Sequence, residues 1–172
     1  IQVGKQKLAI NFIEKSRRNQ AVIAAVVAVL WLLKLPLLMS WPKLELAQRA
    51  QSKRHPNGAL WIDDSYNASL LAFAHAIESL SLRAEKTVLV AGEMGGLGDH
   101  SMRVHRYLAH ILNQADIDHV VFYGDSMYQA FLHYNGCAEY VANIASLERV
   151  LARYTSAEYV VWIKGSRHLE LE

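Results

Sequence analysis

Four runs of mainly apolar residues stand out along the chain, each ending near Asp, Gly or Lys. Many of their residues are β-branched. Continuous apolar runs bounded in this way are typical of strands buried on both faces of a sheet. The predicted strands are 59–62, 86–92, 119–124 and 159–165.

Between these runs, apolar residues recur every three or four positions, which predicts helices. In the first helical stretch Leu70, Phe73 and Ile77 fall on one side, and Ser69 is a candidate N-cap. Because strands alternate with helices, the fold class predicted is α/β, with a mostly parallel sheet and helices on both faces. The predicted helices are 70–82, 101–115, 126–133 and 146–154.

A different apolar segment lies near the start of the chain. Residues 21–33 are thirteen apolar residues in a row, a length typical of a buried core helix. Asn19 is a candidate cap for its start, and Pro36 a candidate stop. Extended to Trp41, the same segment is long enough to span a bilayer with Lys34 inside it. The buried helix is the preferred interpretation, so no membrane contact is expected.

Composition narrows the class of protein. Of 172 residues, 52% are hydrophobic and 20% are charged, which excludes a disordered chain. The net charge of +2 gives no support for nucleic-acid binding. Cys137 is the single cysteine, so an internal disulfide and a cysteine-based zinc site are excluded. A change to polar, basic residues places a domain boundary near residues 42–48, and 56–58 predicts a tight turn.

Polar residues gather where the predicted strands end, which is where ligands of parallel sheets bind. Asp63 and Asp64 end the first strand. Their carboxylates could bind a ribose diol or a cation, or they could instead stabilise the N-terminus of the following helix. Glu93 follows the second strand with the same ambiguity. The segment 164–167 supplies an ammonium, a hydroxyl and a guanidinium, which could bind a carboxylate or a phosphate. The alternative interpretation is a solvated turn without a ligand. Histidine spacing predicts no metal site.

Four segments together resemble the Mur ligase family, specifically its MurF type. Residues 63–68 (DDSYNA) resemble its D-D-[ST]-Y-N-A motif, and residues 92–105 resemble its G-[DE]-M-x-E-L-G-x-x-S-x-x-x-H block. Residues 164–172 resemble its K-G-S-R-x-x-x-x-E block, and Gln48-Arg49 falls where the family has Gly-Arg. The sequence departs from the family pattern at Val22, Ser69, Leu70, Gly96 and Gln48.

The resemblance implies a Rossmann-like C-terminal domain of a cytoplasmic bacterial ligase of peptidoglycan synthesis. Such enzymes use ATP and Mg²⁺ to join D-alanyl-D-alanine to UDP-N-acetylmuramoyl-tripeptide through an acyl phosphate. By carry-over, the expected nucleotide-binding residues are Arg49, Asp64, Asn67 and Asn19. The expected substrate-binding residues are Tyr66, Glu93, His105, Lys164, Ser166 and Arg167.

The resemblance also implies that the chain is a fragment. Arg18-Asn19 and the Ala-rich segment after them resemble the H-N-x-x-N-A-x-A-A helix at the end of the family's central ATPase domain, with Arg18 in place of His. Residues 1–47 are therefore expected to be the helical tail of that domain, and residues 48–172 the C-terminal domain. Its expected partner is therefore the rest of its own polypeptide, and the fragment contains no Walker A motif of its own. Two alternatives remain open. One is another amide ligase of the superfamily, of the folate polyglutamate or cyanophycin type, and the other is a membrane-tethered binding module without catalysis.

Overall fold

The computed structural model describes residues 2–3, 6–7, 17–36 and 48–171. Its contacts divide the chain into two compact units, residues 1–44 and 45–172. In the first unit, strands β1 (Gln2–Val3) and β2 (Gln6–Lys7) pair antiparallel, and helix α1 spans Arg17–Leu32. The second unit holds all the other elements and nine of the ten predicted site residues.

Helix α1 begins earlier than the sequence predicted. Because it starts at Arg17, Asn19 lies within the helix and the prediction that Asn19 is its N-cap is wrong. The helix ends as predicted before Pro36. Lys34 adopts a left-handed conformation with φ 54°, and Leu35 N–H donates to the carbonyl of Leu30 at 2.9 Å, a turn that closes helices.

The 21–41 segment therefore does not continue as one helix, since the chain turns at Lys34; residues 37–41 lie outside the described residues. Within the parts of the chain that the structure describes, none of the helices has the length and apolar character needed to cross a bilayer.

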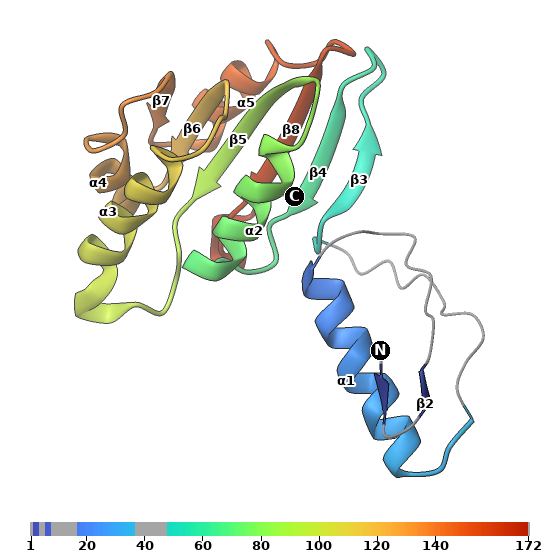
Figure 1. Cartoon of the computed structure of the whole chain (residues 1–172). Coiled ribbons are helices and arrows are strands. Elements are labelled where there is room, and N and C mark those ends of the chain that lie inside the picture. Colours follow the sequence, from blue (N-terminus) through green and yellow to red (C-terminus); the bar gives the residue numbers. More distant parts are fainter. Residues whose placement is uncertain (1, 4–5, 8–16, 37–47, 172) are drawn as a thin grey trace. The chain divides into compact units, whose positions relative to one another are not determined.

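The second unit is built on a six-stranded sheet with the spatial order β3-β4-β8-β5-β6-β7 (Figure 1). All neighbouring strands are parallel except β3, which pairs antiparallel with β4. The predicted mostly parallel α/β fold is confirmed. The strands are β3 (Gln51–Arg54), β4 (Leu60–Asp64), β5 (Lys86–Gly92), β6 (His119–Tyr123), β7 (Ala138–Val141) and β8 (Tyr159–Lys164).

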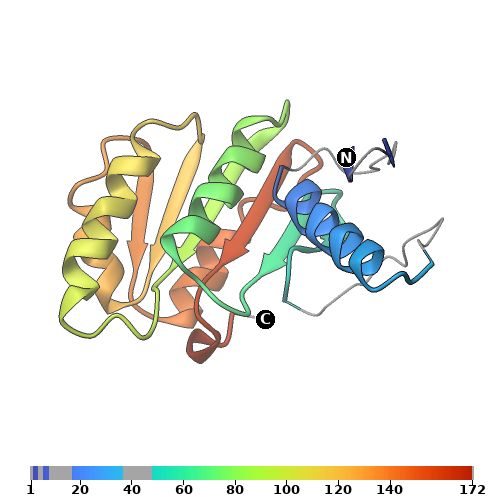
Figure 2. The same ribbon diagram turned by 60° about the horizontal axis from the view of Figure 1, so that its bottom comes forward.

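Helices cover both faces of this sheet, as the sequence predicted (Figures 1 and 2). Helices α2, α3 and α4 pack on one face over a core that includes Phe73, Leu108 and Phe122. Helix α5 packs on the other face over a core that includes Val121 and Leu147. The helices are α2 (Leu70–Ser81), α3 (Ser101–Leu112), α4 (Tyr128–Phe131) and α5 (Ile144–Leu151), with 3-10 turns at Gly98–His100, Asp125–Met127 and Arg167–Leu169.

The helix boundaries follow side-chain caps. Ser69 caps α2 as predicted, because its hydroxyl accepts a hydrogen bond from Ala72 N–H at 3.2 Å. Asn143 caps α5 in the same way through Ser146 N–H, so this helix begins two residues before the predicted start. The predicted helix 126–133 is instead a 3-10 turn followed by one short helical turn.

Within the six-stranded sheet, the two strands that the sequence analysis missed, β3 and β7, both lie at the edges. Strand β3 consists of Gln51–Arg54, and three of its four residues are exposed. Strand β7 has three half-buried residues and one buried residue. Edge strands face solvent along one side and are often short and polar, so they lack the continuous apolar run of a central strand.

Candidate functional site

The carboxyl ends of β4, β8 and β5 are neighbours in the sheet, and they bring together three loops that are far apart in the sequence. The parallel register pairs Asp64 directly with Lys164, and Ala91 with Lys164 on the other side. Asn67 and Glu93 follow β4 and β5. The prediction that Asp64, Asn67, Glu93 and Lys164 lie along one edge of the sheet is therefore confirmed.

A buried ion pair fixes the loop after β4. Lys164 Nζ donates to Asp64 Oδ2 at 2.7 Å and to the carbonyl oxygen of Asn67 at 3.1 Å. The Lys164 side chain is only 2% exposed, and its ammonium lies 5.9 Å from the centre of the Phe73 ring. A buried ammonium needs such partners to offset its lost hydration. Lys164 thus holds the loop through contacts within the chain, and its expected substrate contact stays a prediction.

Asp63 and Asp64 have different tasks. Asp63 Oδ1 accepts hydrogen bonds from the amide of Ser65 at 3.1 Å and from its hydroxyl at 2.6 Å, which closes a tight turn after the strand. Asp64 faces Lys164, and 22% of its side chain stays exposed. Neither carboxylate caps α2, because Ser69 does so. The sequence analysis had left open the interpretation of Asp64 as a helix cap, and the structure removes it.

An aromatic ring between two guanidinium groups forms the exposed part of the site. The Arg49 guanidinium lies 4.2 Å from the centre of the Tyr66 ring, and that of Arg167 lies 5.7 Å from it. All three residues are exposed, and Tyr66 N–H donates to the carbonyl of Gln48 at 3.1 Å. Cation–π contact orders both guanidinium groups while leaving their N–H donors to anionic ligands. Gln48 has φ 58°, a conformation that favours the glycine of the family pattern.

Glu93 joins the loop after β5 to two other loops. Its carboxylate accepts a hydrogen bond from Ser126 N–H at 3.0 Å and contacts His168 Nε2 at 2.9 Å. Burial by itself raises the pKa of Glu93, but the hydrogen bonds from His168 and Ser126 together outweigh burial, and the net pKa is lowered. The carboxylate is therefore held ionised. Neither His168 nor Ser126 was among the residues predicted from the sequence.

Ser166 joins the loop after β8 to the loop after β5. Its amide donates to the carbonyl of Glu93 at 3.1 Å, and its hydroxyl accepts from Gly95 N–H at 2.7 Å. Ser166 is 5% exposed. The two loops come so close that a Cβ on Gly92 would lie 3.1 Å from the Cα of Gly165. Ser166 therefore holds the loops after β5 and β8 together, and its expected substrate contact stays a prediction.

His105 lies in α3 and is fully buried. Its Nδ1 lies 2.8 Å from the carbonyl oxygen of Ser101, and its Nε2 accepts from Met94 N–H at 2.9 Å. Both contacts are satisfied when the ring is neutral with its proton on Nδ1. Burial lowers the pKa of His105, and the contacts with Ser101 and Glu93 only partly oppose this. With both nitrogens engaged within the chain, His105 anchors the 92–95 loop, and its expected substrate contact stays a prediction.

The nine predicted site residues of the second unit thus separate by burial. Lys164, Ser166 and His105 are buried and hold the loops, and Glu93 is half-buried and links them. The residues left facing solvent at this edge are Arg49, Tyr66, Asn67 and Arg167, together with part of Asp64. Asn19 belongs to the first unit, and its expected nucleotide contact stays a prediction.

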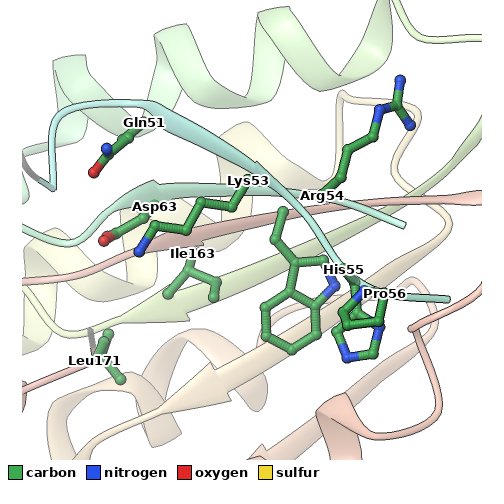
Figure 3. A pocket seen from close by; sticks show the side chains of 9 residues that line it. Gln51, Lys53, Arg54, His55, Pro56, Asp63, Ile163 and Leu171 are labelled. Carbon is green, nitrogen blue, oxygen red and sulfur yellow. The ribbon is translucent and has the colours of Figure 1, made fainter. Parts of the chain in front are cut away.

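A hollow of about 290 Å³ lies beside β3, β4 and β8 (Figure 3). It is on the face of the sheet opposite to that of Asp64 and Lys164. Alternation along β4 and β8 sends Asp63 and Ile163 to this face, beside Leu171. Its lining includes Asp63 but none of the ten site residues that the family resemblance implied. It is lined by Gln51, Lys53, Arg54, His55, Pro56, Trp61, Asp63, Ile163 and Leu171.

Among the residues that the structure describes, no group of three His, Cys, Asp or Glu side chains is placed to hold a metal ion. The exposed side chains at the sheet edge offer anion binding through Arg49 and Arg167, and hydrogen bonding through Asp64 and Asn67.

Comparison with known proteins identifies the family of the chain. Residues 48–167 match the family model described as "Mur ligase, glutamate ligase domain". The chain belongs to the Mur ligase family. The match covers all three loops of the site and every predicted site residue except Asn19.

Curated Mur ligases resemble the chain over part of their length. It is 31% identical over 143 residues to UDP-N-acetylmuramoyl-tripeptide–D-alanyl-D-alanine ligase of Haemophilus influenzae, covering 76% of this chain and 31% of that protein. It is 24% identical to the enzyme of the same name from Buchnera aphidicola, covering 98% of this chain and 38% of that protein. The chain thus spans less than two fifths of these relatives.

Solved Mur ligase structures share the fold. The MurF ligase of Thermotoga maritima in complex with ADP superimposes with a TM-score of 0.72 at 26% identity, over 86% of this chain and 34% of that one. MurF of Acinetobacter baumannii superimposes with a TM-score of 0.77 at 24% identity, over 89% of this chain and 35% of that one. The latter likeness is one of fold alone.

Proposed function

We propose that this chain is the C-terminal part of an ATP-dependent ligase that joins D-alanyl-D-alanine to UDP-N-acetylmuramoyl-tripeptide. The observation that carries the proposal is the 31% identity to a curated ligase of that name across 76% of the chain. The sheet edge in this region exposes the guanidinium groups of Arg49 and Arg167, which suit anionic substrates. ATP and Mg²⁺ are its proposed cofactors, and a cytoplasmic location follows from the nature of these substrates. Residues 1–47 are proposed to be the tail of the central ATPase domain.

The exposed residues are the proposed ligand contacts. Asp64 Oδ2 is engaged by Lys164, so the other carboxylate oxygen is the one proposed to accept hydrogen bonds from the ribose hydroxyls. Arg49 and Arg167 have the planar donor groups that bind phosphate or carboxylate in a bidentate manner. Asn67 Oδ1 accepts a hydrogen bond from Ala68 N–H at 2.8 Å. Its Nδ2 is therefore the group proposed to donate a hydrogen bond to the substrate.

The buried residues are proposed to give these contacts a fixed geometry. Phosphorylation of the tripeptide carboxylate by ATP, followed by attack of the D-alanyl-D-alanine amine and loss of phosphate, requires reactants held in alignment. Lys164, Ser166 and His105 each join a loop to a neighbouring element through their hydrogen bonds. Mg²⁺, when bound in the complete enzyme, would neutralise charge on the transferring phosphoryl group.

The test uses the complete gene product that contains this sequence. We expect ADP release that requires both UDP-N-acetylmuramoyl-tripeptide and D-alanyl-D-alanine, with the joined peptide detected by mass spectrometry. ADP release that instead requires a folate substrate and glutamate would overturn the proposal in favour of the folate polyglutamate type. No ADP release with either pair, from a folded protein, would favour a binding module without catalysis.

The 172-residue chain alone is expected to release no phosphate from ATP. Its sequence lacks a Walker A motif, and stabilising a transferring phosphoryl group requires such a cradle together with its magnesium. Phosphate release is measured with the purified chain beside a mock preparation. Release above the mock level, and abolished in Asp64→Ala, would contradict this expectation.

A further inference from the structure

Three side chains form a chain of contacts at the end of the sheet opposite the candidate site. His119 begins β6, Cys137 directly precedes β7, and Glu139 lies in β7. Nδ1 of His119 lies 3.1 Å from Cys137 Sγ, and its Nε2 lies 3.0 Å from Glu139 Oε1. Arg153 pairs with the same carboxylate oxygen. The arrangement is that of a nucleophile, a base and a carboxylate that orients the base.

The carboxylate decides which nitrogen of the imidazole carries the proton. An ionised Glu139 only accepts hydrogen bonds, so the neutral His119 ring must carry its proton on Nε2. Its Nδ1 lone pair then faces Cys137 Sγ and is available to accept the thiol proton. Because the thiol and the carboxylate contact opposite nitrogens of one ring, the three groups do not converge on a single metal ion.

The thiol is open to solvent while its base is sheltered. Cys137 is exposed, whereas the His119 side chain is 13% exposed and packs against the Tyr154 ring at a centroid distance of 5.5 Å. The backbone also fixes the pair, since Val120 N–H donates to the carbonyl of Cys137 at 3.0 Å. A reagent can thus reach the sulfur without displacing the imidazole.

A hollow of about 380 Å³ adjoins this cluster and shares Glu139 and Arg153 with it. Arg149 and Ser146 also line it, and the Arg149 guanidinium donates to the Ser146 hydroxyl at 3.0 Å. Arg153 is already paired with Glu139, so Arg149 brings the positive charge that has no carboxylate partner among the contacts of this hollow. Guanidinium groups favour carboxylate ligands.

We propose that Cys137 is a base-assisted thiol that forms a mixed disulfide with low-molecular-weight disulfides carrying carboxylates. The Cys137 thiol transfers its proton to His119 Nδ1, and the thiolate attacks one sulfur of the disulfide. The new S–S bond forms as the old one breaks, and the released thiolate takes the proton from His119. Cys137 is oxidised and the departing thiol is reduced, so no further reactant is needed. This modification site is independent of the ligase function.

The test follows the reaction of the purified chain with glutathione disulfide at pH 7. Cys137 is the single cysteine, so thiol loss and the mass of the mixed disulfide report on it alone. An unassisted thiol is only a few per cent ionised at this pH, so we expect the folded chain to react roughly tenfold faster than the chain unfolded in denaturant. His119→Gln and Glu139→Gln should each remove most of this difference, with the fold checked by circular dichroism.

A neutral reagent tests the anion-binding part. Arg149→Ala is expected to slow the reaction with glutathione disulfide by roughly threefold or more, as expected for one lost charged contact, and to leave the rate with 2-hydroxyethyl disulfide unchanged. Equal rates for the folded and unfolded chains, or a folded His119→Gln variant that reacts like the wild type, would overturn the base-assisted thiol. Equal effects of Arg149→Ala on both reagents would overturn carboxylate recognition.

Discussion

Replacing Asp64 by alanine is expected to lower the free energy of unfolding of this chain by about 3 kcal/mol. The Lys164 side chain is 2% exposed and its ammonium has Asp64 Oδ2 as its only carboxylate partner among the described contacts. Without Asp64, the buried Lys164 ammonium would keep only the Asn67 carbonyl oxygen and the Phe73 ring as described contacts. A buried charge without an opposite charge beside it destabilises the folded state. Chemical denaturation of the purified chain measures the change.

Two matched variants isolate the ion pair. Asp63→Ala removes the neighbouring carboxylate, which only closes a turn with Ser65, and is expected to cost about 1 kcal/mol. The double variant Asp64→Ala/Lys164→Met removes both charges, and is expected to be more stable than Asp64→Ala alone. If Asp64→Ala costs no more than Asp63→Ala, the pair contributes little and this account of Lys164 is wrong.

The same substitution has a second effect in the complete ligase, if Asp64 contacts the ribose as proposed. Loss of a charge-assisted hydrogen bond of roughly 1.5–3 kcal/mol is expected to weaken the apparent ATP affinity about ten- to a hundredfold. Lys164→Met is the control, because it also breaks the ion pair but keeps the carboxylate. It should lower the melting temperature and weaken the apparent ATP affinity much less than Asp64→Ala does. An equal loss of ATP affinity in both variants would show that loop geometry, and not the carboxylate, is responsible.

The positions of the site residues along the sheet were predictable, because strand ends are visible in the sequence. Asp64 and Lys164 each end an apolar run, and the carboxyl ends of parallel strands lie on one edge. Their direct pairing depends on β8 inserting between β4 and β5, although β8 is the last strand in the chain. Nothing local in the sequence specifies that order, so the ion pair itself was not predicted.

Burial was the property that the sequence predicted least well. Lys164, Ser166 and His105 are polar residues that belong to the motifs of the family resemblance, and polar residues are usually exposed. Each is buried because its hydrogen-bond partner comes from a distant loop or from the next turn of a helix. Edge strand β3 escaped prediction for the converse reason, since its exposed polar residues pair with β4 through backbone groups alone.

His105 is the residue whose protonation is expected to limit stability in mild acid. Its pKa is lowered in the folded chain from the ordinary value of 6.5, chiefly by burial. Below pH 6.5 the unfolded chain therefore binds a proton that the folded chain does not, and stability falls as pH decreases. The fall is at most about 1.36 kcal/mol per pH unit and stops at the folded pKa. Glu93, whose lowered pKa starts from 4.5, gives stability that is lost only at lower pH.

The variant His105→Leu separates this titration from the anchoring role. It is apolar and of similar size, and it leaves Met94 N–H without its acceptor, so at pH 8 it should be about 2 kcal/mol less stable than the wild type. Between pH 6.5 and 5 the wild type loses stability and the variant does not lose this component, so the two curves should converge. Urea unfolding at several pH values measures both. Over this pH range the two proteins differ in one titration, because unfolded histidine takes up a proton and leucine cannot. Parallel stability curves would therefore show that His105 does not control the acid response.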